Sequence, residues 1–453
     1  MSAGIVVANA ILLTMDPSTP DPIRGWMSIG EDGRIDGLGE GAPPPGRTVV
    51  DVDGCFVAPG FVSAHSHLFT SGSRGLAADR PLYEWIEGMT RYTEHASAED
   101  IYWCTLHGSL DFLNDGITTA YDFTSSRLSF RAASAGEGTY LGELRPQSFS
   151  DAQYRAKADS GIRFIHSVTL DEAAGTDEEV LSRVAHTVAL DRGASGSAKS
   201  LGVAISGAVQ WAESIRTARL EVEAMRRFSL INQPHLLETP FSIEAQQERF
   251  WWYEEVGALG PDLVFGHFLH TSSEIVKAAA TAGCAMAWQP TSNARLGSGI
   301  ADIPGCLAAG MRVGVGLDDQ SCTDVSDPWQ NMRMGIYLLR ASRRDASLLG
   351  PRQMLALHTL GSAQALSIDH EVGSLAVGKY GDFLVVDPTK PDLGPVWDPY
   401  ATYVLACGLR NLKQVWVGGE LLSESGSSLQ HDDGRVAREV HTRLGAIARR
   451  LER

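Results

Sequence analysis

Short apolar runs alternate with longer stretches of helical spacing along the middle of the chain. The apolar runs occupy residues 56–67, 116–123, 161–168, 201–206, 228–235, 262–267, 284–288 and 311–318. Between them, apolar residues recur with the period of a helix, as in 81–91 and 98–114. Repeated strand–helix alternation predicts a parallel sheet, and eight repeats predict a closed (β/α)8 barrel.

The two ends of the chain are β-rich instead. Apolar runs separated by turn residues occupy 5–13, 25–30 and 34–37, and similar runs occupy 373–387 and 415–422. We therefore predict an α/β protein in which a TIM-like barrel (58–368) carries a small composite β-sandwich domain. That domain combines residues 1–57 with residues 369–430, and the charged, helically spaced residues 431–453 form a C-terminal surface helix.

Composition and charge narrow the range of partners. The chain has 453 residues, 43% of them apolar, and a net charge of -17, which argues against binding nucleic acid or an anionic membrane. No apolar run is long enough to span a bilayer and no signal pattern begins the chain, so we expect a cytoplasmic protein. The six cysteines show no close pairing, which predicts reduced, mostly buried thiols.

Residues able to bind a metal or transfer a proton follow several of the predicted strands. They are His65 and His67 after the first strand, His235 and Glu238 after the fifth, His267 after the sixth, and Asp318 with Asp319 after the eighth. Barrel enzymes place their chemistry at these strand ends. Residues two apart on a strand share a face, so the paired imidazoles make half of a divalent-metal site. The alternative for this pair alone is two polar residues at a strand end.

Four segments carry a resemblance to a known family. Residues 59–67 resemble the first metal motif of the amidohydrolase superfamily. Residues 75–86 and 290–299 resemble segments of its branch containing atrazine chlorohydrolase and the cytosine, guanine and S-adenosylhomocysteine deaminases. Residues 373–387 resemble the return of that branch to its β domain, so the likeness covers nearly the whole chain.

The resemblance implies a metal-activated hydroxide. It gives His65, His67, His235 and Asp318 as ligands of one divalent metal per chain, zinc or alternatively iron(II). Asp318 would accept the proton of the water, His267 would hold the hydroxide or polarise the electrophile, and Glu238 would protonate the leaving nitrogen. A dinuclear site would need a lysine ending the fourth strand, but Lys199 precedes that strand, so we expect one metal.

Other polar and aromatic residues are candidates for binding a substrate. They are Trp85, Tyr121, Phe123, Trp211, Trp288, Gln289, Asn293 and Asp319, each of which could equally serve packing. Many deaminases of the branch carry a Pro-rich segment with Cys or Ser after the fourth strand. Residues 205–211 lack it, which weakens a nucleoside-deaminase interpretation.

We therefore predict an enzyme that hydrolyses a C–N bond of a small nitrogen-containing aromatic or heteroaromatic compound, with deamination preferred. The alternatives are amide, urea or carbamate hydrolysis, as in phenylurea- and thiocarbamate-cleaving relatives, and dehalogenation at the same site. A non-catalytic binding protein on the same barrel is a further alternative, because fold does not fix function. By resemblance we expect a homo-oligomer.

Overall fold

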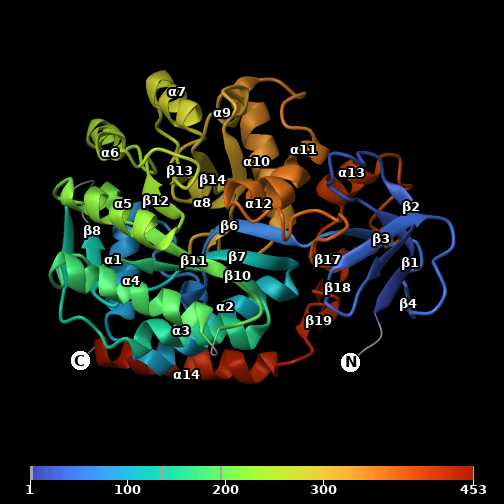
Figure 1. The fold of residues 1–453 in the computed structure, drawn as a ribbon, viewed down its shortest axis with the longest axis horizontal. Helices are drawn as coiled ribbons and strands as arrows, with labels where there is room; N and C mark the ends of the chain where they lie inside the picture. The colour runs from blue at the N-terminus through green and yellow to red at the C-terminus, as the bar shows by residue number, and fades with distance from the viewer. Residues whose placement is uncertain (1–3, 133, 135–136, 194–195, 452–453) are drawn as a thin grey trace.

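Eight parallel strands close into a barrel in the computed structural model, which describes residues 4–132, 134, 137–193 and 196–451 (Figure 1). The strands are β6 (Phe61–His67), β7 (Ile117–Phe123), β10 (Arg163–Thr169), β11 (Ser200–Gly207), β12 (Asn232–Leu236), β13 (Val264–His267), β14 (Ala285–Trp288) and β15 (Arg312–Val315) with β16 (Asp318–Asp319). The last strand is split: β15 pairs with β14, whereas β16 pairs with β6 and so joins the two ends of the sheet. The predicted (β/α)8 barrel is thus confirmed.

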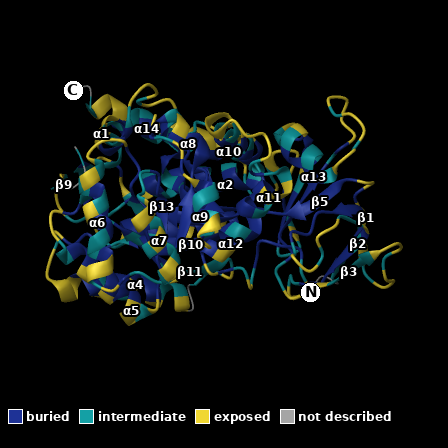
Figure 2. Cartoon of the chain, turned by 90° about the horizontal axis from the view of Figure 1, so that it is seen from above, coloured by how far each residue is buried: buried dark blue, intermediate teal, exposed yellow. Residues whose placement is uncertain are grey.

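Helices cover the outside of this barrel. Their bounds are α1 (Leu82–Thr93), α2 (Ala98–Asn114), α3 (Ser148–Ser160), α4 (Asp177–Arg192), α5 (Arg216–Phe228), α6 (Ile243–Glu255), α7 (Ser273–Ala282), α8 (Pro290–Arg295), α9 (Ile303–Ala308), α10 (Pro328–Arg343), α11 (Pro351–Ala356) and α12 (Ser362–Ala365). Capping boxes begin α2, at Ser97 with Asp100, and α4, at Thr176 with Glu179. Figure 2 shows the strands buried and the outer sides of helices such as α4 and α6 exposed, so the apolar core lies between the two layers.

Both ends of the chain build a second sheet of nine strands beside the barrel. Its strands are β1 (Ile5–Leu12), β2 (Ile23–Ile29), β3 (Ile35–Glu40), β4 (Thr48–Asp51), β5 (Phe56–Pro59), β17 (Phe383–Val386), β18 (Leu412–Val417), β19 (Glu420–Glu424) and β20 (Ser427–Ser428). The antiparallel pair β5–β17 joins the N-terminal and C-terminal halves, as the composite domain predicts. The chain leaves this sheet at Gly60, between β5 and β6. The predicted domain boundary between residues 57 and 58 therefore falls inside β5.

The C-terminal helix α14 (Asp433–Leu451) returns from the small sheet to the barrel and runs along it (Figure 1). Its buried residues Val440, Leu444 and Ile447 form one apolar cluster with Ala96 and Cys104 of the barrel. The helix is therefore amphipathic, with one face packed and the other at the surface. Within the described part of the chain, no helix is long and apolar enough to cross a membrane. All six cysteines are buried and free.

A buried ion pair joins the barrel to the small sheet. Arg163 Nε lies 2.6 Å from Asp382 Oδ2, and both side chains are less than 5% exposed. The guanidinium also stacks on Tyr380 at 3.6 Å, and the carboxylate accepts a hydrogen bond from the Gly418 amide at 2.6 Å. The contact therefore ties the barrel strand β10 to the loops that flank β17 and β18.

We expect Arg163→Met to destabilise the protein by about 3–5 kcal/mol, because the substitution leaves the Asp382 carboxylate buried without its cation. The shift of the urea-unfolding midpoint measures this loss. Arg80→Met is the matched control, since its ion pair with Glu84 is more than half exposed and contributes at most about 0.5 kcal/mol. Equal midpoints for the two variants would contradict the assignment.

Candidate active site

Three imidazoles and one carboxylate converge at the carboxyl ends of the barrel strands. His67 Nε2 lies 3.3 Å from His65 Nε2 and 3.2 Å from His235 Nε2. Asp318 Oδ1 lies 3.3 Å from His65 Nε2 and 3.6 Å from His67 Nε2. The strands β6, β12 and β16, distant in sequence, therefore deliver their polar ends to one point.

This donor set fits a divalent cation. Zinc–nitrogen bonds of about 2.0–2.1 Å in a tetrahedron place neighbouring ligand atoms about 3.3 Å apart. The observed separations are 3.2–3.6 Å. Neutral imidazole lone pairs aimed at one point repel each other unless a cation lies between them. The candidate ligand atoms form two overlapping groups, His65 with His67 and Asp318, and His65 with His235 and His267, each within 4.8 Å.

The backbone bends sharply where these strands end. Leu237, His267 and Asp318 all have left-handed backbone angles, with φ of 58°, 66° and 66°. Such conformations cost about 1–3 kcal/mol each in a non-glycine residue and gather at functional sites. The turn at Leu237 presents Glu238 to the site three residues after His235, and the turn at His267 is supported by Gln289 Oε1, which accepts from its amide at 3.0 Å.

Buried amides hold two of the imidazoles in place. Gln233 Oε1 lies 2.5 Å from His65 Nδ1, so this nitrogen carries the proton and Nε2 presents its lone pair to the cluster. The Asn293 Nδ2 group lies 2.8 Å from His267 Nδ1. In this arrangement the amide donates to Nδ1, and the neutral His267 ring carries its proton on Nε2, where it can donate a hydrogen bond.

Burial sets the protonation of the site. It lowers the pKa of His67 and of His267 to about 3, so both rings are neutral at physiological pH. Burial and then the charge of Asp318 raise the pKa of Glu238 well above its usual value. Burial opposes ionisation of Asp318, but its pKa lies below the usual range, and the Nε2 hydrogen of His267, 3.9 Å from Asp318 Oδ2, favours the carboxylate. The pKa values of the two carboxyl groups are thus shifted in opposite directions, as a general acid and a general base of one reaction would require.

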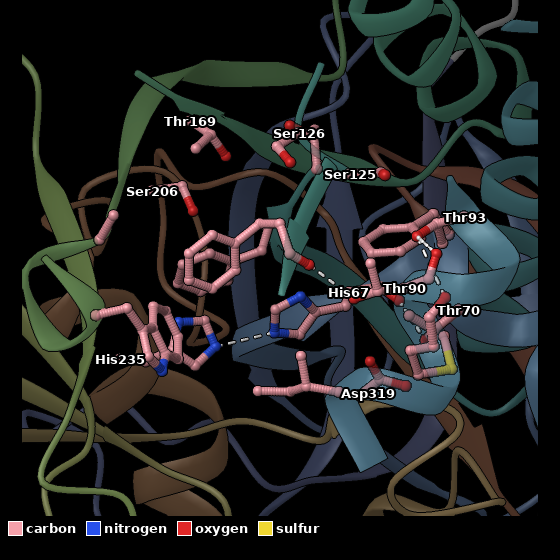
Figure 3. A pocket seen from close by; sticks show the side chains of 18 of the residues that line it. His67, Thr70, Thr90, Thr93, Ser125, Ser126, Thr169, Ser206, His235 and Asp319 are labelled. Atoms are coloured by element: carbon pink, nitrogen blue, oxygen red, sulfur yellow. Dashed lines mark hydrogen bonds between the residues drawn. The ribbon is translucent and has the colours of Figure 1, made fainter. Parts of the chain in front are cut away.

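A cavity of about 210 Å³ opens above these groups (Figure 3). His67, His235, Glu238 and Asp318 lie on its wall, and so do the predicted substrate-binding residues Trp85, Trp211 and Asp319. Burial raises the pKa of Asp319 to about 7, and its Oδ1 accepts from the Ser321 hydroxyl at 2.6 Å. Glu238 Oε1 lies 3.5 Å from His267 Nε2, whereas its Oε2 has no hydrogen-bond partner among the described residues.

Four other predicted substrate-binding residues lie beneath or outside the cavity. Tyr121 donates its hydroxyl to the Ile205 carbonyl at 2.8 Å inside the barrel. Trp288 packs outward on α10, so closely that a Cβ on Gly335 would lie 2.7 Å from its ring. Gln289 and Asn293 contact His267 from below the cavity, as described above. These four support the site through packing and hydrogen bonds.

The cavity also has walls that the sequence analysis does not identify. The hairpin of β8 (Ser129–Ala132) and β9 (Gly138–Leu141) contributes Phe130 and Tyr140, and α1 contributes Met89. No periodicity signals this hairpin. Gln233 is also missed, although it precedes His235 by two residues on one strand and therefore faces the same way.

Known proteins match this chain over nearly its whole length. The amidohydrolase family model matches residues 56–422. The chain is 28% identical to a 5-methylthioadenosine/S-adenosylhomocysteine deaminase of Syntrophobacter fumaroxidans over 99% of both chains. It is also 28% identical to a 5'-deoxyadenosine deaminase of Methanosarcina acetivorans over 97% of both.

Solved structures share the fold at lower identity. An adenosine deaminase from Xanthomonas campestris with bound zinc superposes with a TM-score of 0.83, at 18% identity over 99% of both chains. Atrazine chlorohydrolase from Arthrobacter aurescens TC1, complexed with zinc, gives a TM-score of 0.83 at 19% identity, covering 97% of this chain and 100% of that one. Because the family model spans most of the sequence, the chain belongs to the amidohydrolase family and is a metal-dependent hydrolase acting on C–N bonds.

Proposed function

We propose that the enzyme deaminates an amino-substituted heteroaromatic ring by hydrolysis, with one metal ion held by His65, His67, His235 and Asp318. The observation that carries this proposal is the convergence of three imidazole nitrogens and the Asp318 carboxylate beside a second carboxyl group, Glu238, whose Oε2 has no hydrogen-bond partner among the described residues. When bound, the metal supplies a hydroxide near neutral pH. Zinc is the expected metal, with iron(II) as the alternative.

The protein side chains divide the proton transfers between them. Asp318 accepts the proton that the water loses, because its carboxylate is kept ionised among the imidazoles. His267 donates its Nε2 hydrogen to the attacking oxygen or to the developing negative charge on the ring. Glu238 donates its proton to the leaving nitrogen, so that ammonia departs instead of an amide anion. The two carboxyl groups thus perform the base and the acid steps.

The names of the relatives direct the choice of substrate. Two are deaminases of 5-methylthioadenosine with S-adenosylhomocysteine and of 5'-deoxyadenosine. Adenine nucleosides are therefore the first ring class to test here, with the amino group at the metal site and the ring between Trp85, Phe123 and Trp211. The homo-oligomer and the cytoplasmic location stay predictions.

A substrate screen with separate product detection tests this function. The zinc-loaded enzyme is incubated with aminated purines, pyrimidines, pterins and triazines, and in parallel with phenylureas, anilides and chlorinated rings. Ammonia, aniline and chloride are followed separately. We expect ammonia from a ring amine. Aniline or chloride without ammonia would overturn the deamination and move the reaction to amide, urea or carbon–halogen bonds.

A further inference from the structure

Away from the proposed metal site, the side chains of the active-site cavity offer almost no positive charge to a substrate. Beside the three acids at the reacting centre, Glu238, Asp318 and Asp319, the described residues of its wall include one charged side chain, Arg145. The rest of the wall is aromatic, aliphatic or hydroxyl-bearing. Away from the metal, a substrate anion would therefore depend on Arg145 for a partner inside this cavity.

The guanidinium of Arg145 is already hydrogen-bonded to backbone carbonyl groups. Its Nη1 donates to the Thr93 carbonyl at 2.8 Å and its Nε to the Arg127 carbonyl at 3.1 Å. Its Nη2 donates to the Ser126 carbonyl, and the guanidinium stacks on the ring of Phe149 at 3.7 Å. The three nitrogens thus join the loop after β7 to the end of α1, and the side chain could turn to a ligand only by breaking these bonds.

A second cavity, which shares the walls formed by Tyr140 and Trp211, is unsuited to an anion as well. Glu172 and Glu213 lie on it. Glu172 is 8% exposed, and its Oε2 has no partner among the described residues. Arg216 also lies there, but its Nη2 pairs with Asp177 at 2.6 Å. A substrate tail that extends past Trp211 therefore meets an uncompensated carboxylate.

Neutral hydroxyl groups are available where cations are not. Thr169 ends the third barrel strand and Ser206 lies on the fourth, both on the side of the cavity opposite His67 and Asp319 (Figure 3). In the part of the chain that the structure describes, neither hydroxyl has a hydrogen-bond partner. They can donate to or accept from a neutral polar group, such as a sugar hydroxyl, without any change of charge.

We propose that this cavity excludes anionic substrates: an amino-substituted ring whose remaining part carries hydroxyl or apolar groups is accepted, and one whose remaining part bears a lone carboxylate or phosphate is rejected. This inference rests on the proposed deamination. Among substrates named for the relatives, 5'-deoxyadenosine and 5-methylthioadenosine carry no anionic group. The physical reason is that a buried anion without a cation loses its hydration and gains nothing in return.

Two nucleosides that differ only in charge test the proposal. Adenosine 5'-carboxamide and adenosine 5'-carboxylate have the same shape, and conversion of each to its inosine counterpart by the zinc-loaded enzyme is followed by chromatography. We expect kcat/KM to be about 100-fold or more higher for the carboxamide. Deamination of both at comparable kcat/KM would overturn the selection and leave the deaminase function standing.

A binding measurement distinguishes failure of the proposed selectivity from failure of the proposed deaminase function. If neither nucleoside is deaminated, the proposed function is wrong for adenine. The affinities of the two nucleosides, measured by calorimetry, then test the exclusion of anions. Tighter binding of the carboxamide supports it, and equal or absent binding overturns it.

Glu172→Gln removes the unpaired charge and should narrow the difference in kcat/KM between the two nucleosides. Glu178→Gln is the matched control and should leave it unchanged, because that carboxylate is 73% exposed and pairs with Arg227.

Discussion

Removal of the metal abolishes deamination, and one equivalent of zinc restores it: this is the result we expect from chelation followed by titration of the apoprotein. Without the cation, the attacking water keeps a pKa near 15.7 instead of about 7, so hydroxide is scarce at neutral pH. The imidazoles of His65, His67 and His235 would also face each other at 3.2–3.3 Å with nothing between them. Activity and metal content, measured on the same samples, follow the titration.

Substitutions of the proposed metal ligands test whether the required metal binds at the cluster of His65, His67, His235 and Asp318. His235→Asn should lose the metal together with the activity. His270→Asn is the matched control, because His270 Nε2 bonds to the Ser298 carbonyl at 2.8 Å outside the cluster. That variant should keep one metal per chain. Magnesium should not replace zinc, since it prefers oxygen ligands. Full activity in metal-free protein would contradict the proposed hydroxide chemistry.

Sequence patterns predict the barrel and the converging residues for one physical reason. Each strand is a short apolar run, and a histidine or aspartate at its carboxyl end has no apolar role to fill. This places His65, His235, His267 and Asp318 on one edge before any coordinates are known. The sharp turns at Leu237 and Asp318 are not predictable in this way, because their positive φ angles are imposed by packing around the site.

The pattern of apolar residues does not show how deep in the barrel a side chain lies. Tyr121 and Phe123 share a face of β7, yet Phe123 lies against the rings of His65 and His67 at the cavity whereas Tyr121 lies a layer deeper. Period-two spacing distinguishes inside from outside but does not tell one layer from the next. Trp288 instead belongs to the outer face of the barrel sheet and packs on α10.

The second large effect that we expect follows from the proposed acid role of Glu238. We expect Glu238→Gln to lower kcat for an amino substrate by about 10²–10⁴-fold, because an amide cannot supply the proton that the leaving nitrogen needs. The metal content should stay at the wild-type value, since Glu238 is not among the proposed ligands. Glu371→Gln makes the same chemical change at a half-buried carboxylate that pairs with Arg34 in the junction to the small sheet, and should leave kcat unchanged.

A substrate whose leaving group needs no proton separates acid catalysis from simple damage to the site. Chloride departs from 6-chloropurine riboside as an anion, so the Glu238→Gln enzyme should convert this compound at a rate within about tenfold of the wild type while its rate with the amine falls far more. Unequal losses require that Glu238 acts on the departing nitrogen. Equal losses with both substrates would instead make Glu238 a positioning residue for the ring or for His267, which lies 3.5 Å away.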